Sequence, residues 1–99
     1  MKPLIPIDHE AIDEFCRRHH IVRLSLFGSV LRDDFRPESD VDVLVEFAEG
    51  FVPGLEFIAM QEELSDLLGR KADLVTIGSL NHRIRDRVLA TAQEQYAQG

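Results

Sequence analysis

The chain has 99 residues, which is enough for one hydrophobic core, so we expect residues 1–99 to form a single domain. Asp and Glu number 18 against 11 Lys and Arg, and the resulting net charge of −7 disfavours direct binding to nucleic acid or anionic membranes. The single cysteine excludes an internal disulfide, and no apolar run approaches the ~20 residues of a membrane span. We therefore expect a cytoplasmic domain that binds cations or basic partners.

Hydrophobic periodicity predicts helices that alternate with strands. Apolar residues at helical spacing predict helices over residues 6–20, 55–69 and 80–97. Alternating apolar residues predict strands over residues 21–28, 40–47 and 71–78, with room for a further short strand near residues 47–52. Residues 29–35 are long enough for a short helix, and Pro37 predicts a loop over residues 36–39. This order favours an α/β (α+β) fold in which a small sheet of three to four strands is flanked by helices.

Asp40 and Asp42 interrupt a stretch that otherwise has the composition of a buried strand. They are two residues apart, so they point to the same side of the strand, where unpaired burial would cost several kcal/mol. Asp73 lies on the next predicted strand and converges with them if the two strands are neighbours. Their mutual repulsion favours a divalent cation such as Mg²⁺, and two such ions ~3.5–4 Å apart can clamp a phosphoryl or nucleotidyl displacement.

Gly28 and Ser29 follow the first predicted strand and begin the short helix. Glycine lets the backbone approach a ligand closely, and the N–H groups at the helix start, with the Ser29 hydroxyl, can hold phosphate oxygens. Arg32, about one turn further on, is placed to reach a phosphate or to fix the loop. A Gly-Ser turn alone is usually only a turn, and an Asp-x-Asp alone is usually a cap or a solvated edge. Together, in this order and spacing, these features favour a nucleotide–metal site.

These residues form one pattern: Gly28-Ser29, then ten further residues, then Asp40-x-Asp42. The pattern resembles the signature of the nucleotidyltransferase superfamily, which includes DNA polymerase beta. The stretch LFGSVLRDDFRPESDVDVLVEF resembles this signature as it stands in the minimal nucleotidyltransferases, the MNT proteins. The stretch LEFIAMQEELSDLLGRKADLVT is similar to that subfamily's helix leading into the strand with the third carboxylate. By motif, the resemblance covers about residues 20–77.

This resemblance implies the polymerase beta-like palm fold, with a mixed sheet, and a role for each site residue. Asp40 and Asp42 would bind Mg²⁺, as a pair of ions. Asp73 would be the third metal ligand and would activate the attacking hydroxyl. Gly28, Ser29 and Arg32 would bind the triphosphate of the substrate ATP. The common family form has Arg-Gly where this chain has Arg32-Asp33, which adds a negative charge near the phosphates.

Many MNT proteins are antitoxins encoded beside a HEPN-domain ribonuclease toxin, and the resemblance implies the same partner here. The implied reaction transfers AMP from ATP to a tyrosine of the toxin, with which the chain would form a hetero-oligomer. The acidic charge suits docking to a basic RNA-binding partner. Two alternatives stay open. One is a binding module that neutralises its partner by occlusion, with a nucleotide-binding but non-catalytic site, and the other is a small-molecule nucleotidyltransferase.

Other polar residues have simpler interpretations. The arginines of the last predicted helix, Arg83, Arg85 and Arg87, are more often a solvated face, and contact with ATP phosphates or the partner is the rarer interpretation. Cys16 falls on the apolar stripe of the first predicted helix, so we expect it in the core and without a catalytic role.

Overall fold

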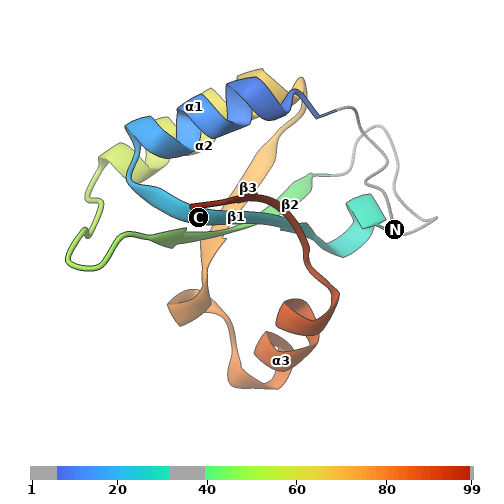
Figure 1. Ribbon diagram of the computed structural model, residues 1–99. Coiled ribbons are helices and arrows are strands. Elements are labelled where there is room, and N and C mark those ends of the chain that lie inside the picture. The colour runs from blue at the N-terminus through green and yellow to red at the C-terminus, as the bar shows by residue number, and fades with distance from the viewer. Residues whose placement is uncertain (1–6, 32–39, 99) are drawn as a thin grey trace.

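The structure, a computed structural model, describes residues 7–31 and 40–98. Its elements, in chain order, are helix α1 (His9–Arg18), strand β1 (Ile21–Phe27), 3-10 helix η1 (Gly28–Leu31), strand β2 (Val41–Phe47), helix α2 (Glu56–Leu68), strand β3 (Ala72–Thr76), 3-10 helix η2 (Ile77–Ser79), helix α3 (His82–Thr91) and strand β4 (Gln93–Ala97). Figure 1 shows a single sheet with α1 and α2 on one side and α3 on the other. None of the helices in the described segments is long and apolar enough to cross a membrane.

Within the described residues, four strands form one mixed sheet in the order β3-β2-β1-β4. Strand β1 pairs antiparallel with both β2 and β4, whereas β2 and β3 run parallel. Parallel neighbours need a crossover connection, and α2 supplies it. The mixed sheet flanked by helices confirms the expected architecture, including each of the three strands that alternation predicts.

The C-terminal part of the chain differs from the prediction. The helix predicted over residues 80–97 ends at Thr91, because Ala92 takes an extended conformation (φ −61°, ψ 140°). Residues 93–97 then form β4, in which Tyr96 pairs with Leu24 of β1. The polar sequence of β4 carries little strand signal, so the unpaired edge of β1 decides its conformation through backbone hydrogen bonds. The short strand considered near residues 47–52 is also wrong, since β2 ends at Phe47 and a turn and loop follow.

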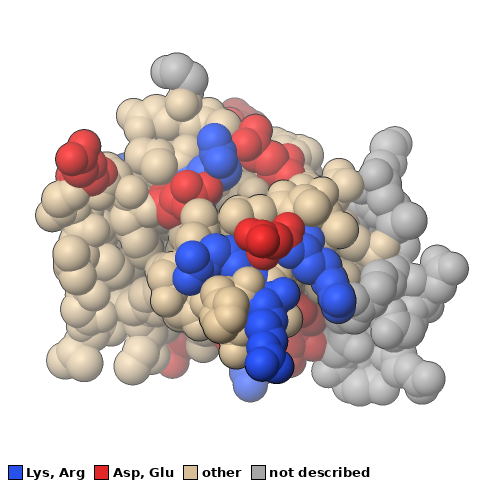
Figure 2. Space-filling model, turned by 90° about the horizontal axis from the view of Figure 1, so that it is seen from below, with Lys and Arg blue, Asp and Glu red and all other residues tan. Residues whose placement is uncertain are grey.

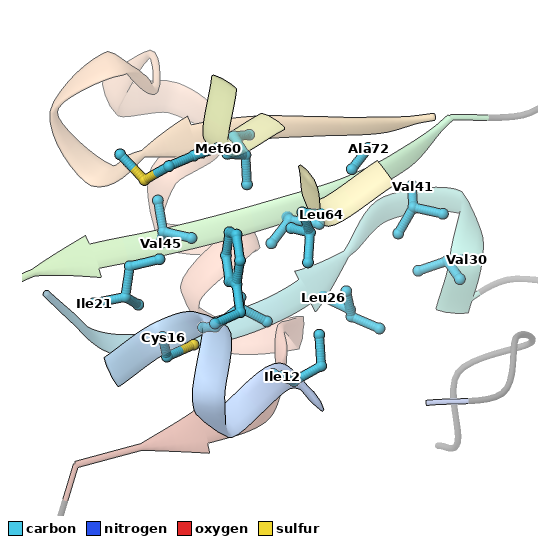
Figure 3. Close-up of a cluster of buried hydrophobic side chains, with 14 of the residues drawn as sticks. Ile12, Cys16, Ile21, Leu26, Val30, Val41, Val45, Met60, Leu64 and Ala72 are labelled. Carbon is cyan, nitrogen blue, oxygen red and sulfur yellow. The ribbon is translucent and has the colours of Figure 1, made fainter. Parts of the chain in front are cut away.

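The face of the sheet beneath α1 and α2 holds the larger hydrophobic cluster, which Figure 3 shows in close-up. Val41, Val43 and Val45 of β2 point into this cluster, as the alternation of the strand predicts. Phe15 of α1 and Leu64 of α2 pack there and are fully buried. The amphipathic stripes of both helices therefore close over one face of the sheet.

Cys16 is fully buried in the same cluster. Burial, reinforced by the negative charge of Asp13, raises the pKa of its thiol to about 12. The thiolate is therefore scarce at neutral pH, and the expected core role of Cys16 is confirmed.

The opposite face is covered only in part, by α3 and the segment before it (Figure 1). A small second cluster of buried residues lies there: Leu44, Leu80 and Val88. Ile84 and Leu89, which the helical pattern places on the inner face, are instead 45% and 46% exposed. Helix α3 therefore buries Val88 and leaves much of its other apolar surface uncovered.

Candidate functional site

The turn that ends β1 lies directly against a carboxylate of β2. Phe27, the last residue of β1, is the register partner of Asp42. The next residue, Gly28, has a left-handed φ of +81°. A Cβ at position 28 would overlap Asp42 Oδ2 and would stand 3.2 Å from Asp42 Cγ. Glycine is therefore required for two reasons, its backbone conformation and the space that the carboxylate occupies.

The structure brings the three predicted carboxylates to one end of the sheet. Asp42 and Asp73 are register partners in the parallel pair β2–β3. Asp40 stands two residues before Asp42, directly ahead of β2. The residues next to Asp42 and Asp73 along each strand enter the core beneath α1 and α2. Because side chains alternate along a strand, Asp42 and Asp73 point to the α3 side of the sheet.

The burial expected for the Asp40–Asp42 pair is only partly present. Asp42 is half-buried and has an interaction partner. The Asp40 side chain is 46% exposed, because this residue precedes β2 and does not belong to it. Its Oδ2 lies 3.9 Å from Lys71 Nζ, a long and solvated pair that is worth at most about 1 kcal/mol. The cost of burying charge is therefore smaller than the strand pattern implies.

The donor set suits a hard divalent cation, although its side chains are not gathered around a common point. Within residues 7–31 and 40–98, no three His, Cys, Asp or Glu side chains are grouped closely enough to ligate one ion. Carboxylate oxygens from adjacent strands are nevertheless the ligands that Mg²⁺ takes, because it keeps waters and phosphate oxygens in its other positions. The residues fit the ion by their chemistry, and Mg²⁺ binding by Asp40, Asp42 and Asp73 stays a prediction.

A cavity of about 430 Å³ opens beside Gly28. Gly28 and Leu31 line it from η1, and the end of α3 with the start of β4 lines it from the other side: Arg87, Ala90, Thr91, Ala92 and Gln93. This volume falls within the range of about 300–1,000 Å³ that is typical of small-molecule sites. Residues 90–93 were not predicted to belong to a site, because their helical pattern placed them inside a longer helix. The turn at Ala92 is what brings them to the cavity.

The predicted nucleotide-binding residues other than Gly28 are described in part or not at all. The backbone of Ser29 belongs to η1, beside the cavity wall, and only its backbone is described. The prediction for Arg32, together with its neighbour Asp33, lies outside the described residues. Arg87, for which phosphate contact was the rarer interpretation, lies on the cavity wall.

Comparison with known proteins identifies the class to which this fold and site belong. Residues 9–94 match the nucleotidyltransferase domain family, and the chain belongs to that family. It is similar to the protein adenylyltransferase MntA of Thermococcus cleftensis, with 40% identity over 77 residues, which cover 77% of this chain and 76% of that protein.

Solved structures agree with this assignment. A structure assigned to the minimal nucleotidyltransferases is 40% identical, with a TM-score of 0.70 over 85% of each chain. A chain of the complex between the tri-AMPylated HEPN toxin of Shewanella oneidensis and its MNT antitoxin has a TM-score of 0.65. That match covers 91% of this chain and 70% of the other at 20% identity, so it supports the fold alone. The protein is a minimal nucleotidyltransferase, as its signature predicts.

Proposed function

We propose that this protein is a Mg²⁺-dependent adenylyltransferase of the cytoplasm that transfers AMP from ATP to a tyrosine of a HEPN toxin and thereby acts as an antitoxin. One observation carries the proposal: Gly28 lies against the carboxylate of Asp42 and also lines the cavity. Both lie at the end of the sheet where Asp42 and Asp73 are register partners. A nucleotide in that cavity would have its phosphates next to the carboxylates. The acceptor is suggested by the names of similar proteins, a protein adenylyltransferase and a complex with an AMPylated HEPN toxin.

In the proposed reaction, the tyrosine oxygen bonds to the α-phosphorus of ATP. The bond from that phosphorus to the oxygen bridging to the β-phosphorus breaks, and pyrophosphate leaves with the bonding electrons. The Asp73 carboxylate accepts the proton of the tyrosine hydroxyl. Backbone N–H groups of the Gly28–Ser29 turn hold the phosphate tail. Mg²⁺, held by Asp40 and Asp42, would neutralise charge on the phosphate oxygens.

The test is to incubate the protein with its HEPN toxin, ATP and Mg²⁺ and to weigh both intact chains. We expect AMP increments on the toxin, which are lost when the acceptor tyrosine is replaced by phenylalanine. Asp40→Ala combined with Asp42→Ala should abolish the increments while the complex with the toxin persists. The control is Glu62→Ala combined with Asp66→Ala, which removes the same charge from exposed positions of α2. Wild-type protein that leaves no increment on the toxin with any nucleotide would contradict the proposal.

A second candidate function is neutralisation of the partner by occlusion, without transfer. Two observations favour it: Asp40 lies toward Lys71, and no closed set of ligands exists among the described residues. Occlusion needs the docking surface and not the carboxylates. If the variant lacking Asp40 and Asp42 still protects cells from the toxin, occlusion is the function and transfer is dispensable.

A further inference from the structure

Basic side chains gather on the α3 side of the molecule, which Figure 2 shows from below. The ten residues of α3 include one aspartate and three arginines: Arg83, Arg85 and Arg87. The chain as a whole carries a net charge of −7, so this helix is a local exception. It covers the same side of the sheet to which Asp42 and Asp73 point.

Arg87 is the member of this group that lines the cavity beside Gly28. Thr91, four residues later on the same face of α3, lines the cavity too. The Thr91 hydroxyl is already engaged, because it donates to the backbone carbonyl of Arg87 at 2.8 Å. Arg87 is therefore the cationic residue that α3 brings to the cavity wall, and its guanidinium carries several N–H groups in one plane.

Arg87 makes no ion pair with any carboxylate in the part of the chain that the structure describes. Arg23 of β1, by contrast, forms two ion pairs. Its Nη1 lies 3.3 Å from Glu46 Oε2, and its Nε lies 3.2 Å from Glu94 Oε1. Arg87 also stands four residues after Arg83, a spacing at which like charges on a helix repel. With Arg83 one turn away and no carboxylate partner among the described residues, Arg87 is suited to binding an anion at the cavity wall.

We propose that Arg87 binds the phosphate tail of the nucleotide, from the side of the cavity opposite to the Gly28–Ser29 turn. This inference rests on the proposed function, because it requires a nucleotide in the cavity. The planar guanidinium matches phosphate oxygens with two parallel hydrogen bonds, which an ammonium group cannot form. The chain thus holds the phosphates between a backbone turn after β1 and a side chain from α3, two elements that lie about sixty residues apart in the sequence.

The experiment measures nucleotide binding to the purified protein directly, without the toxin. Wild type, Arg87→Ala, Arg87→Lys and Arg83→Ala are titrated with ATP and Mg²⁺, with AMP and with adenosine. Arg83→Ala is the matched control, because it removes the same charge from the same helix one turn away from the cavity wall. Arg87 is exposed, so its replacement leaves the fold intact, and thermal unfolding checks this.

We expect Arg87→Ala to weaken ATP binding about tenfold or more, the effect of one hydrogen-bonded charge, while adenosine binding is unchanged. Arg87→Lys should restore the affinity in part, and Arg83→Ala should stay within about twofold of wild type. Equal losses for ATP and adenosine would show that Arg87 stacks on the base, which overturns the proposal. ATP binding of Arg87→Ala equal to that of wild type overturns it as well, with the proposed function intact. Wild type that binds no ATP contradicts the proposed function itself.

Discussion

The two faces of the sheet differ in how much apolar surface they bury. The face under α1 and α2 holds the main cluster, in which Phe15, Met60 and Leu64 are fully buried. The face under α3 holds a small cluster around Leu44 and carries the carboxylates and the cavity. A domain of this size has apolar residues for one complete core. Stability therefore resides on one face, and the other face is free to carry polar groups that would be costly in a core.

The largest effect is expected from removing the carboxylate of Asp73, which tests whether one face of the sheet serves catalysis and the other serves stability. Asp73→Asn should slow AMP transfer by about 10²–10⁴-fold, the contribution of a positioned base. It should change the free energy of unfolding by less than about 0.5 kcal/mol, because Asp73 is exposed. Transfer rates and urea unfolding measure both quantities, and Glu62→Gln on the opposite side serves as control. A transfer rate close to that of wild type would remove Asp73 from the mechanism.

Truncating one buried residue on each face compares their contributions to stability. Phe15→Ala should lower the free energy of unfolding by about 3–5 kcal/mol, because it leaves a cavity in the main cluster. Val88→Ala should lower it by about 1.5 kcal/mol, since it removes two methyl groups from the smaller cluster. Urea denaturation at one temperature measures both. Equal losses would mean that the α3 face stabilises the fold as much as the other face does.

Alanine substitutions at Gly28 and Gly50 distinguish the cost of backbone strain from the effect of the contact between Gly28 and Asp42 on nucleotide binding. Gly28 and Gly50 have nearly the same left-handed φ, +81° and +83°. A Cβ at position 50 meets nothing within 4 Å, whereas one at position 28 overlaps Asp42. Gly50→Ala should cost about 1–2 kcal/mol of stability and leave nucleotide binding unchanged. Gly28→Ala should cost more and should also weaken ATP binding, because the Asp42 carboxylate must move.

If titration shows the same affinity for ATP in both glycine variants, the close approach of Gly28 to Asp42 has no role in binding.

The smallest effect is expected from Glu63, which joins α1 to α2. Its hydrogen bond from Arg18, and a weaker one from His19, hold the pKa of the Glu63 carboxyl below its ordinary value. A depressed pKa stabilises the fold above the unfolded value of about 4.3, and this stabilisation disappears as the pH falls through the folded value. Glu63→Gln should therefore cost up to about 1 kcal/mol at neutral pH and nothing in strong acid. Urea unfolding of both proteins across the acid range measures the difference.

Local patterns predicted the elements whose side chains repeat with a clear period. The valines of β2 alternate with Asp42, Leu44 and Glu46, so the strand and its buried face followed from the sequence alone. The helices α1 and α2 were recognised for the same reason, from apolar residues at helical spacing. The last helix was predicted too long, because Gln93–Ala97 is polar and has no period that distinguishes helix from strand.

By itself, the sequence determined the class of the protein and the strand that carries Asp42, because these depend on residues close together in the chain. Only the tertiary structure decided that Asp42 and Asp73 are register partners and that residues 93–97 complete the sheet. It also decided that Arg87 faces the same cavity as Gly28. Contacts between distant segments depend on which strand edges and helix faces remain to be covered, and no local pattern records that.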